Sequence, residues 1–438
     1  MAKRPEVLRA RCARALEGAL RRSPVALLLG TRQCGKTTLA RSHVHPDAPN
    51  YFDLENPVHL QRLAEPMTAL AGLRGTVVID EIHRRPELFP VLRVLADRED
   101  APARFLVLGS ASLSLLKQAS ESLAGRVAVV EMSGFALDEV GGAALETLWL
   151  RGSYPRSFLA DDDADSSAWR RDYVQMVLER DVPQFGGSLA TATLHRFWSM
   201  VAHCHGGVWS SSDPARSLGV AETTVRRYLD LLTDLLLLRQ VQPWFENLGK
   251  RQVKAPKVYF RDSGLLHHFL GVQSLDQLLG HARCGASWEG FVLEQVLRCV
   301  QPEAHYFWGT HAGAELDLLL FAGGKRLGVE MKRSDAPGST KSLEIARHDL
   351  ELDGAVIVYP GRERYTIAPG VEAVPLAELV GNGPHVLFPQ LFRPARGVAG
   401  TGRKPRTAGK AKKAKKAKKA KKAKKTKKAK KTGGKPQR

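Results

Sequence analysis

The sequence has 438 residues, of which 43% are hydrophobic, and its 66 Lys and Arg against 45 Asp and Glu give a net charge of +21. A chain of this length exceeds one ordinary hydrophobic core, so we expect two or three domains. The five cysteines are scattered and include no Cys-x-x-Cys pair, which argues against a disulfide framework or a zinc ribbon and favours a reducing cytosol.

The first residues and the apolar runs indicate a protein of the cytoplasm. The opening segment "MAKRPEVLRARCARALEGAL" carries charges throughout and lacks the apolar stretch of a signal peptide. The most apolar helix-like run, "YLDLLTDLLLLRQV", is shorter than the roughly 20 residues that span a bilayer. We therefore expect no membrane partner.

Residues 25–140 alternate short apolar runs with longer amphipathic segments. Runs such as "VALLLG", "TVVIDE" and "RFLVLGS" suit buried strands. This alternation predicts the α/β fold class, with a parallel sheet covered by helices on both faces. We place this first domain at residues 1–145 and a largely helical extension at residues 146–206.

The segment "LLLGTRQCGKTTLA" contains Gly30-x-x-x-x-Gly35-Lys36-Thr37 between an apolar run and a helix-forming stretch. In this context the glycines let backbone N–H groups surround a phosphate, and the helix N-terminus adds its positive end. We expect ATP as the ligand, with Lys36 acting as a catalytic residue at the β- and γ-phosphates and Thr37 holding Mg²⁺. The other loop residues expected to contact the nucleotide are Thr31, Gln33, Cys34 and Thr38. An unrelated glycine-rich turn is the alternative.

The run "GTVVIDE" supplies the acidic half of such a site. Its apolar residues suit a buried parallel strand that ends in Asp80 and Glu81. Ligands of parallel sheets lie at the carboxyl ends of the strands, so we expect Asp80 to hold Mg²⁺. Glu81 would then orient or deprotonate the attacking water as a catalytic residue.

Two further polar positions are candidates for sensing the nucleotide. The run "RFLVLGSAS" ends in Ser110 and Ser112, either of which could contact the γ-phosphate or instead cap the next helix. Arg126 in "SLAGRVAVV" is a candidate phosphate-sensing or trans-acting arginine, with an ordinary surface arginine as the alternative.

The segments "GTRQCGKTTL", "VVIDEIH", "LGSASLSLL" and "LAGR" together resemble the AAA+ ATPase superfamily. With "YVQMVLERDV", "LGVAETTVRRYLDLL" and "KAPKVYFRDSGLL", they resemble more narrowly the prokaryotic AAA-family ATPases that carry a C-terminal domain of unknown function. The resemblance covers about residues 15–360 and implies a P-loop NTPase fold. In that family the C-terminal region resembles the PD-(D/E)xK nuclease fold.

Residues 207–283 begin with a helix–turn–helix pattern. Gly219 suits a turn, and the following "ETTVRRYLDLL" places apolar residues at helical spacing with Arg226 and Arg227 on the more polar side. A winged-helix module would insert this helix into a DNA major groove. A helical packing unit that binds protein, or nothing, is the alternative.

The stretch "AELDLLLFAGGKRLGVEMKRSD" predicts a β-hairpin in the last domain, residues 284–392. A two-residue turn at Gly323-Gly324 places Asp317 opposite Glu330 and Glu315 opposite Lys332. The same register predicts one wholly apolar face, made of Leu316, Leu318, Leu320, Leu327, Val329 and Met331.

Two carboxylates that face each other on a sheet destabilise it unless a cation intervenes. Mg²⁺ could bind both Asp317 and Glu330, with Glu289 as a further ligand, or Lys332 could neutralise the pair. The series Asp317-x12-Glu330-Met331-Lys332 matches the PD-(D/E)xK signature, and the resemblance implies catalysis by Asp317, Glu330 and Lys332. A solvated face with a Glu315–Lys332 ion pair is the alternative.

The last segment, residues 393–438, carries most of the net charge. Of the 66 Lys and Arg, 20 lie within residues 403–438 together with no Asp or Glu, which leaves about +1 for the rest of the chain. Such a segment cannot bury a core, and we expect it to be disordered when free and to bind DNA by neutralising phosphates, like lysine-rich linker-histone tails. An acidic membrane surface or a solubility tail is the alternative.

These features lead to two functional hypotheses. The first is an ATPase that hydrolyses ATP with Mg²⁺ and acts on or near DNA through the nuclease-like domain and the tail. The second is an ATP-dependent switch or scaffold whose nuclease-like domain is inactive and binds a protein partner. A homo-oligomer and association with the nucleoid stay open.

Overall fold

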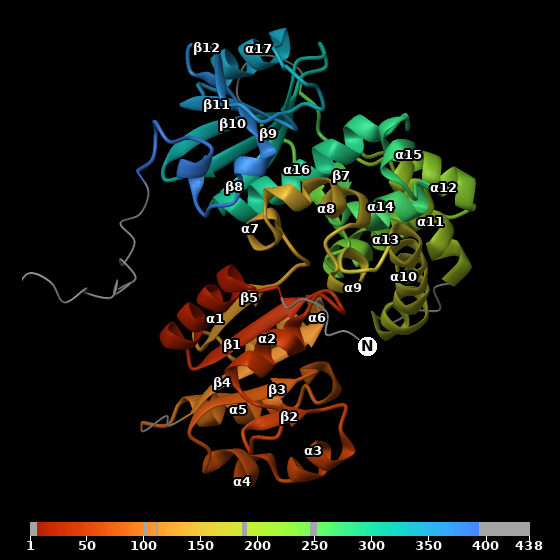
Figure 1. Ribbon diagram of the computed structural model, residues 1–438. Coiled ribbons are helices and arrows are strands. Elements are labelled where there is room, and N and C mark those ends of the chain that lie inside the picture. The colour runs from red at the N-terminus through yellow and green to blue at the C-terminus, as the bar shows by residue number, and fades with distance from the viewer. Residues whose placement is uncertain (1–6, 100–102, 111–112, 186–190, 246–251, 394–438) are drawn as a thin grey trace, which may run out of the picture. The chain divides into compact units, whose positions relative to one another are not determined.

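Figure 1 presents the computed structural model of the chain, which describes residues 7–99, 103–110, 113–185, 191–245 and 252–393. The described part has the predicted α/β class: a parallel five-stranded sheet with helices around it, and a separate C-terminal domain rich in strands. The predicted tail at residues 403–438 lies outside the described residues. Within the described ranges, every helix is too short or too polar to span a bilayer.

The N-terminal sheet has the strand order β2-β3-β4-β1-β5, and all its neighbouring strands are parallel. Its strands are β1 (Val25–Gly30), β2 (Tyr51–Asp53), β3 (Gly75–Asp80), β4 (Ala103–Ser110) and β5 (Val127–Glu131). β1 is buried along its whole length, as expected for an apolar run covered on both faces. The carboxyl ends of β1, β4 and β3 therefore lie side by side at one edge.

Helices cover both faces of this sheet (Figure 1). Those of this part are α1 (Ala10–Arg22), α2 (Lys36–His43), α3 (Pro57–Arg62), α4 (Pro66–Ala71), η1 (Ile82–Arg84), α5 (Leu88–Ala96) and α6 (Leu113–Ser122). α1 and α2 pack on the face that carries Leu28, whereas α5 and α6 pack on the face that carries Leu27. Because successive strand residues point to opposite faces, this division follows from the strand period of two.

A helical region follows the sheet. It contains α7 (Leu137–Val140), η2 (Gly142–Ala144), α8 (Leu145–Arg151), α9 (Pro155–Phe158), α10 (Asp163–Met176), the π-helical turn η3 (Val177–Asp181), η4 (Val182–Phe185) and α11 (Thr191–His203). Asp162 caps α10 by accepting a hydrogen bond from the Asp165 N–H at 2.8 Å. The wider π turn directly continues α10 and ends at Asp181.

The predicted helix–turn–helix pattern is present, followed by a two-stranded antiparallel sheet. The elements are α12 (Ser212–Leu218), α13 (Glu222–Asp234), β6 (Leu238–Val241), β7 (Lys257–Phe260), α14 (Ser263–Phe269) and α15 (Leu275–Leu279). Gly219 ends α12 with φ +67°, a conformation that glycine adopts without strain. Arg226 and Arg227 are exposed on α13, while Val225 and Leu229 are buried. Binding of this unit in a DNA groove stays a prediction.

The C-terminal domain contains a mixed sheet with the order β12-β13-β11-β10-β9-β8. Its elements are α16 (Cys284–Val300), β8 (Ala304–Gly309), β9 (Glu315–Ala322), β10 (Lys325–Met331), α17 (Lys341–Asp349), β11 (Gly354–Tyr359), β12 (Tyr365–Ala368), β13 (Val371–Pro375), η5 (Leu376–Glu378) and η6 (Pro384–Val386). α16 packs in one core cluster with Val358 and α17 packs in another with Ile357, so the two helices cover opposite faces of the sheet.

The predicted hairpin register is confirmed from the turn to the pair Val329–Leu318. Gly323 and Gly324 both have positive φ, as a two-residue turn of this kind requires. The predicted apolar face is wrong at Leu316, which lies in the core cluster on the α17 side rather than with Leu318. The reason is a shift of register between β9 and β8, which places a β-bulge at Asp317 and Leu318.

Candidate functional site

The loop between β1 and α2 has a backbone shape that depends on its two glycines. Gly35 has φ +104°, and a Cβ placed on Gly30 would lie 2.1 Å from the Met132 carbonyl oxygen. α2 begins at Lys36 directly after this turn, and no side chain caps its N-terminus. Its first N–H groups are therefore available to an anion.

The Lys36 side chain is folded into the loop. Lys36 is only 6% exposed, and its ammonium donates hydrogen bonds to the carbonyl oxygens of Gly30 (3.0 Å) and Thr31 (2.9 Å). A lysine ammonium has three N–H donors, so two carbonyl partners leave capacity for an anionic third.

A cavity of about 480 Å³ adjoins this loop. The predicted residues that line it are Gln33, Gly35, Lys36, Thr37, Thr38 and Glu81. Apolar side chains of Val7, Phe135, Pro155 and Leu159 form another part of its wall. Its volume and mixed lining suit a small ligand with one apolar and one anionic end. Gly30, Thr31 and Cys34 are not among its lining residues, and the buried Cys34 thiol contacts the Met132 carbonyl instead.

Asp80 ends β3 beside the start of α2. It is 3% exposed; its Oδ1 accepts the Glu81 N–H at 3.0 Å and its Oδ2 accepts the Tyr51 hydroxyl at 3.1 Å. Burial raises the pKa of Asp80, and hydrogen bonds from the Thr37 and Tyr51 hydroxyls oppose this rise. Because the Thr37 hydroxyl and the Asp80 carboxylate are adjacent hard oxygen donors, these residues fit the predicted Mg²⁺ site.

Glu81 has an unusual backbone conformation at the cavity. Its φ of +58° and ψ of +47° lie in the left-handed region, which costs a non-glycine residue about 1 kcal/mol or more. The carboxylate contacts His83 Nδ1 at 3.1 Å and lies 4.0 Å from the Arg32 guanidinium. Burial opposes its charge, but His83, Lys36 and Arg32 outweigh burial and hold the pKa of Glu81 below its usual value. Glu81 is therefore a carboxylate able to accept a proton.

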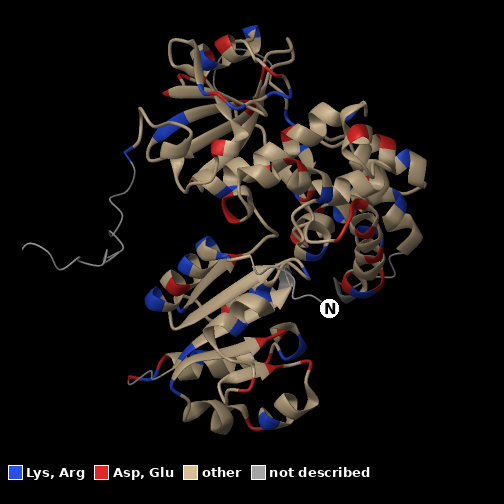
Figure 2. Ribbon diagram, in the orientation of Figure 1, with Lys and Arg blue, Asp and Glu red and all other residues tan. Residues whose placement is uncertain are grey.

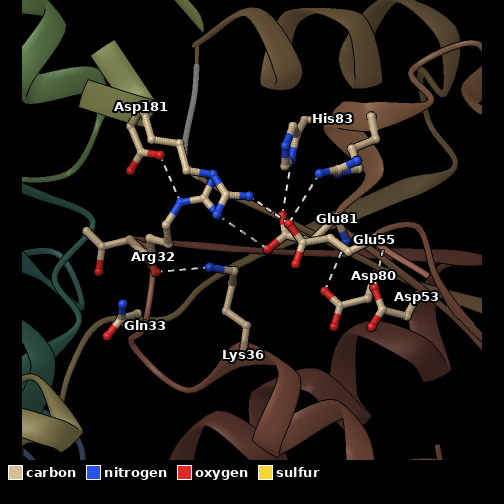
Figure 3. Close-up of polar contacts among 12 residues, drawn as sticks. Arg32, Gln33, Lys36, Asp53, Glu55, Asp80, Glu81, His83 and Asp181 are labelled. Atoms are coloured by element: carbon tan, nitrogen blue, oxygen red, sulfur yellow. Dashed lines mark hydrogen bonds and ion pairs between the residues drawn. The ribbon is translucent and has the colours of Figure 1, made fainter. Parts of the chain in front are cut away.

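Arg32 connects the loop to the helical region (Figure 3). Its Nε donates to Asp181 Oδ1 at 2.8 Å, and its carbonyl accepts the Tyr173 hydroxyl at 3.3 Å. Gln33 contacts the Met176 sulfur at 3.6 Å. Neither Arg32 nor Asp181 is predicted as a site residue from the sequence, because the wider π turn that positions Asp181 leaves no pattern in it.

The predicted sensor residues lie at different edges of the sheet. Ser110 is the register partner of Gly30, and its buried hydroxyl has no hydrogen-bond partner among the described residues. Arg126 precedes β5 at the opposite edge, where it pairs with Asp97 at 3.0 Å. Within one chain Arg126 thus does not line the nucleotide cavity, and its trans-acting role stays a prediction. Ser112 lies outside the described residues.

A second group of charges lies around Lys257 of β7, which contacts carboxylates of the C-terminal domain. The Lys257 side chain is 4% exposed, and its ammonium pairs with Glu289 of α16 at 3.2 Å and with Glu315 of β9. The Tyr259 hydroxyl also donates to Glu289, at 2.6 Å. Burial lowers the pKa of Lys257, but Glu289, Asp317 and Glu315 outweigh burial and raise it, so the lysine is charged.

Asp317 and Glu330 each have a partner within the protein. Asp317 Oδ2 accepts the Met331 N–H at 2.8 Å, and burial, followed by Glu289 and Glu330, raises its pKa well above the usual value. Lys332 pairs with Glu330 at 2.8 Å. The alternative Glu315–Lys332 ion pair is wrong, because Glu315 pairs with Lys257. The contact of Lys332 with Glu330 agrees with the expectation that Lys332 neutralises these carboxylates.

Binding of Mg²⁺ by Asp317, Glu330 and Glu289 stays a prediction. No group of three or more His, Cys, Asp or Glu side chains among the described residues is arranged to hold a metal ion. Lys257 and Lys332 place positive charge beside Glu289 and Glu330. Glu289, Glu315 and Glu330 thus each form an ion pair with a lysine. A catalytic role of Asp317, Glu330 and Lys332 stays a prediction.

Three family descriptions match consecutive parts of the chain. Residues 22–141 match an AAA domain, residues 142–276 match a domain of unknown function (DUF8612), and residues 284–379 match another domain of unknown function (DUF4143). Two relatives are "Uncharacterized protein Mb2031c" of Mycobacterium bovis and "Uncharacterized protein Rv2008c" of Mycobacterium tuberculosis. Each is 52% identical over 369 residues, which are 84% of this chain and 83% of the relative.

The chain is also similar to solved structures, at low sequence identity. The Walker-type ATPase PABY2304 of Pyrococcus abyssi is 14% identical with a TM-score of 0.42, over 60% of this chain and 96% of that one. The P-loop NTPase domain of the sigma-54 transport activator from E. coli is 22% identical with a TM-score of 0.21, over 28% of this chain and 93% of that one.

Proposed function

The chain belongs to the family of the mycobacterial proteins Mb2031c and Rv2008c, and from this premise we propose that it is an AAA-type ATPase that hydrolyses ATP with Mg²⁺. The observation that carries the proposal is the convergence of Lys36, Thr37 and Glu81 on one cavity beside an uncapped helix N-terminus. Phosphate binding at such a terminus is favoured by both its free N–H groups and its dipole.

Each residue then has a distinct task. Lys36 binds the terminal phosphates, and the α2 N–H groups hold the phosphate chain in place. Thr37 and Asp80 would hold Mg²⁺, which when bound neutralises charge on the phosphates. Glu81 orients the attacking water and accepts its proton at the carboxylate, which its low pKa keeps ionised. Ser110, the register partner of Gly30 at the end of β4, would contact the γ-phosphate.

Substitution of Lys36 tests this proposal. Lys36→Ala should lower the rate of ATP hydrolysis by about 100-fold or more, since it removes the charge that stabilises the terminal phosphates. The matched control is Lys117→Ala on α6, because the Lys117 side chain is 75% exposed and does not line the cavity. Equal turnover in the two variants would refute the assignment.

We further propose that the ATPase acts on or near DNA. Support comes from the exposed Arg226 and Arg227 of α13 and from the basic residues 403–438. Over the described elements, by contrast, basic and acidic residues are interspersed (Figure 2). Deletion of residues 403–438 should flatten the salt dependence of DNA binding, because each released counterion contributes to the slope. An unchanged slope would show that these residues are not the contact.

The alternative is an ATP-dependent switch or scaffold with an inactive nuclease-like domain that binds a protein. The pairing of Lys257 with Glu289 and Glu315 favours it, since a buried lysine takes the place of a metal. Incubation of plasmid DNA with Mg²⁺ and each nucleotide separates the hypotheses. Cleavage that is lost in Glu330→Ala and Lys332→Ala supports a nuclease, and absence of cleavage under every condition supports the scaffold.

A further inference from the structure

A second cavity, of about 270 Å³, is lined by five arginines. They come from segments far apart in the chain: the start of α1, strand β6, the residue after β7, and α16. The arginines are Arg9, Arg11, Arg239, Arg261 and Arg298. This cavity is distinct from the nucleotide cavity, although Arg9 lines both.

Four of the five arginines have a carboxylate partner. Arg239 donates two hydrogen bonds to Glu294, at 2.5 and 3.1 Å, and Arg261 pairs with Glu131 and Glu294. The remaining ion pairs are Arg9 with Glu139 (2.8 Å) and Arg11 with Asp138 (3.1 Å). Four carboxylates therefore face five guanidinium groups.

Arg298 is the guanidinium without a carboxylate partner in the described part of the chain. Its Nη1 donates only to the backbone carbonyls of Gly134 (3.2 Å) and Phe135 (2.8 Å). Its Nε is buried and has no hydrogen-bond partner among the described residues. Burial lowers the pKa of Arg298, as expected for a cation whose environment does not fully compensate its charge. The cavity thus has one guanidinium that no carboxylate contacts directly, and the buried Nε of this guanidinium is an unused donor.

We propose that this cavity is an anion-binding site for a phosphate group, either free or on a small phosphomonoester. Guanidinium groups bind phosphate through paired N–H donors, and such charge-assisted bonds are strongest where water is excluded. The volume accommodates a phosphate with a short substituent but is little more than half that of the nucleotide cavity. A bound anion would neutralise Arg298 and accept a hydrogen bond from its Nε.

The same residues connect this site to the phosphate loop, and this part of the proposal depends on the proposed ATPase function. Arg9 donates to the Cys34 carbonyl of the loop at 3.0 Å and to the Gly134 carbonyl at 3.1 Å. Arg298 donates to the same Gly134 carbonyl. An anion that attracts Arg9 and Arg298 competes with these bonds, so it would change nucleotide affinity, and nucleotide would change anion affinity by the same factor.

Calorimetric titration of the full chain with inorganic phosphate and with glycerol 3-phosphate tests the site. The Lys36→Ala variant, in which phosphate binding at the loop is weakened, should still bind phosphate in the arginine-lined cavity. Adding Arg298→Met to this variant should lower the phosphate affinity of that cavity at least tenfold. The matched control is Arg216→Met, because Arg216 is an exposed residue of α12. Tighter binding of inorganic phosphate would identify free phosphate as the ligand, and tighter binding of glycerol 3-phosphate would identify a phosphomonoester. Equal affinity with Arg298→Met and Arg216→Met would overturn the proposal.

A milder variant guards against loss of folding. Gln301 lines the cavity and is exposed. Gln301→Glu adds a negative charge there and should weaken phosphate binding several-fold, whereas the neutral Gln301→Asn should not; equal binding to both would contradict the site.

The coupling is tested by the ADP affinity with and without phosphate. If Arg298→Met does not reduce the effect of phosphate on ADP affinity, the coupling is refuted. If the chain binds phosphate but no nucleotide, only the proposed ATPase function is refuted.

Discussion

Arg32 of the phosphate loop and Asp181 of the π-helical turn η3 form an ion pair with an Nε–Oδ1 distance of 2.8 Å, although 149 positions separate them in the sequence. Arg32 also lies 4.0 Å from Glu81, so one guanidinium lies between a residue of the helical region and the proposed catalytic carboxylate (Figure 3). A nucleotide that repositions Arg32 would therefore change its contact with the helical region.

Asp181→Asn should destabilise the protein by about 2 kcal/mol, since it removes a charged partner from a largely buried guanidinium. Both side chains of the pair are 9% exposed. The measurement is the shift of the urea unfolding midpoint. Asp213→Asn is the control, because the Asp213–Arg216 pair is more than three-quarters exposed and should contribute under about 1 kcal/mol. Equal shifts in the two variants would show that the Arg32–Asp181 pair has no special role.

Glu81→Gln should lower ATP hydrolysis by about 100-fold or more while nucleotide affinity changes little. The amide keeps the size of the side chain and its place beside His83 but cannot accept the proton of the attacking water. Single-turnover hydrolysis and the affinity for a fluorescent ATP analogue measure the two quantities separately. A loss of affinity as large as the loss of rate would instead assign Glu81 to binding.

The parts of this fold that the sequence predicts well depend on local patterns. The sequence predicts the Gly30–Thr37 loop and the Asp80–Glu81 pair because each lies within one short segment that contains both a strand and its polar end. The hairpin register was found for the same reason, since the turn at Gly323 and Gly324 determines the pairing of adjacent residues.

The parts that the sequence could not predict depend on contacts between distant segments. The bulge at Asp317 arises from pairing of β9 with β8, not with its hairpin partner β10. Lys257 approaches Glu289 and Glu315 from a strand outside the predicted nuclease-like domain. Neither contact has a periodic signal, so the sequence predicts Mg²⁺ or Lys332 as the cation of the cluster but does not predict Lys257.

Lys257→Met should destabilise the C-terminal domain by about 3 kcal/mol, because it leaves Glu289 without its buried cation. Without Lys257 the carboxylates resemble a vacant metal site, so Mn²⁺ should restore part of the lost stability. Thermal unfolding with and without Mn²⁺ measures both effects. Lys325→Met is the control, since the Lys325–Asp353 pair is about one-third exposed on both sides. A Mn²⁺ effect equal to that in the wild-type chain would argue against a latent metal site.

Glu294 should make the stability of the chain depend on acidity between about pH 5 and pH 3. Burial disfavours the charged form of this carboxylate, but Arg239 and Arg261 outweigh burial and lower its pKa to about 2. A depressed pKa in the folded state stabilises the protein above the unfolded pKa of about 4.3, and this stabilisation is lost as the pH falls toward the folded value. From pH 5 to pH 3 the loss should reach up to about 2 kcal/mol.

Glu294→Gln should be less stable than the wild-type chain at pH 7, and its stability should change less between pH 5 and pH 3. Unfolding by urea at a series of pH values gives both quantities. Glu121→Gln on α6 should keep the wild-type pH dependence, because Glu121 is 65% exposed. If Glu294→Gln and the wild-type chain lose stability in parallel on acidification, then Glu294 is not the carboxylate that balances Arg239 and Arg261, and the count of charges around the arginine-lined cavity would have to change.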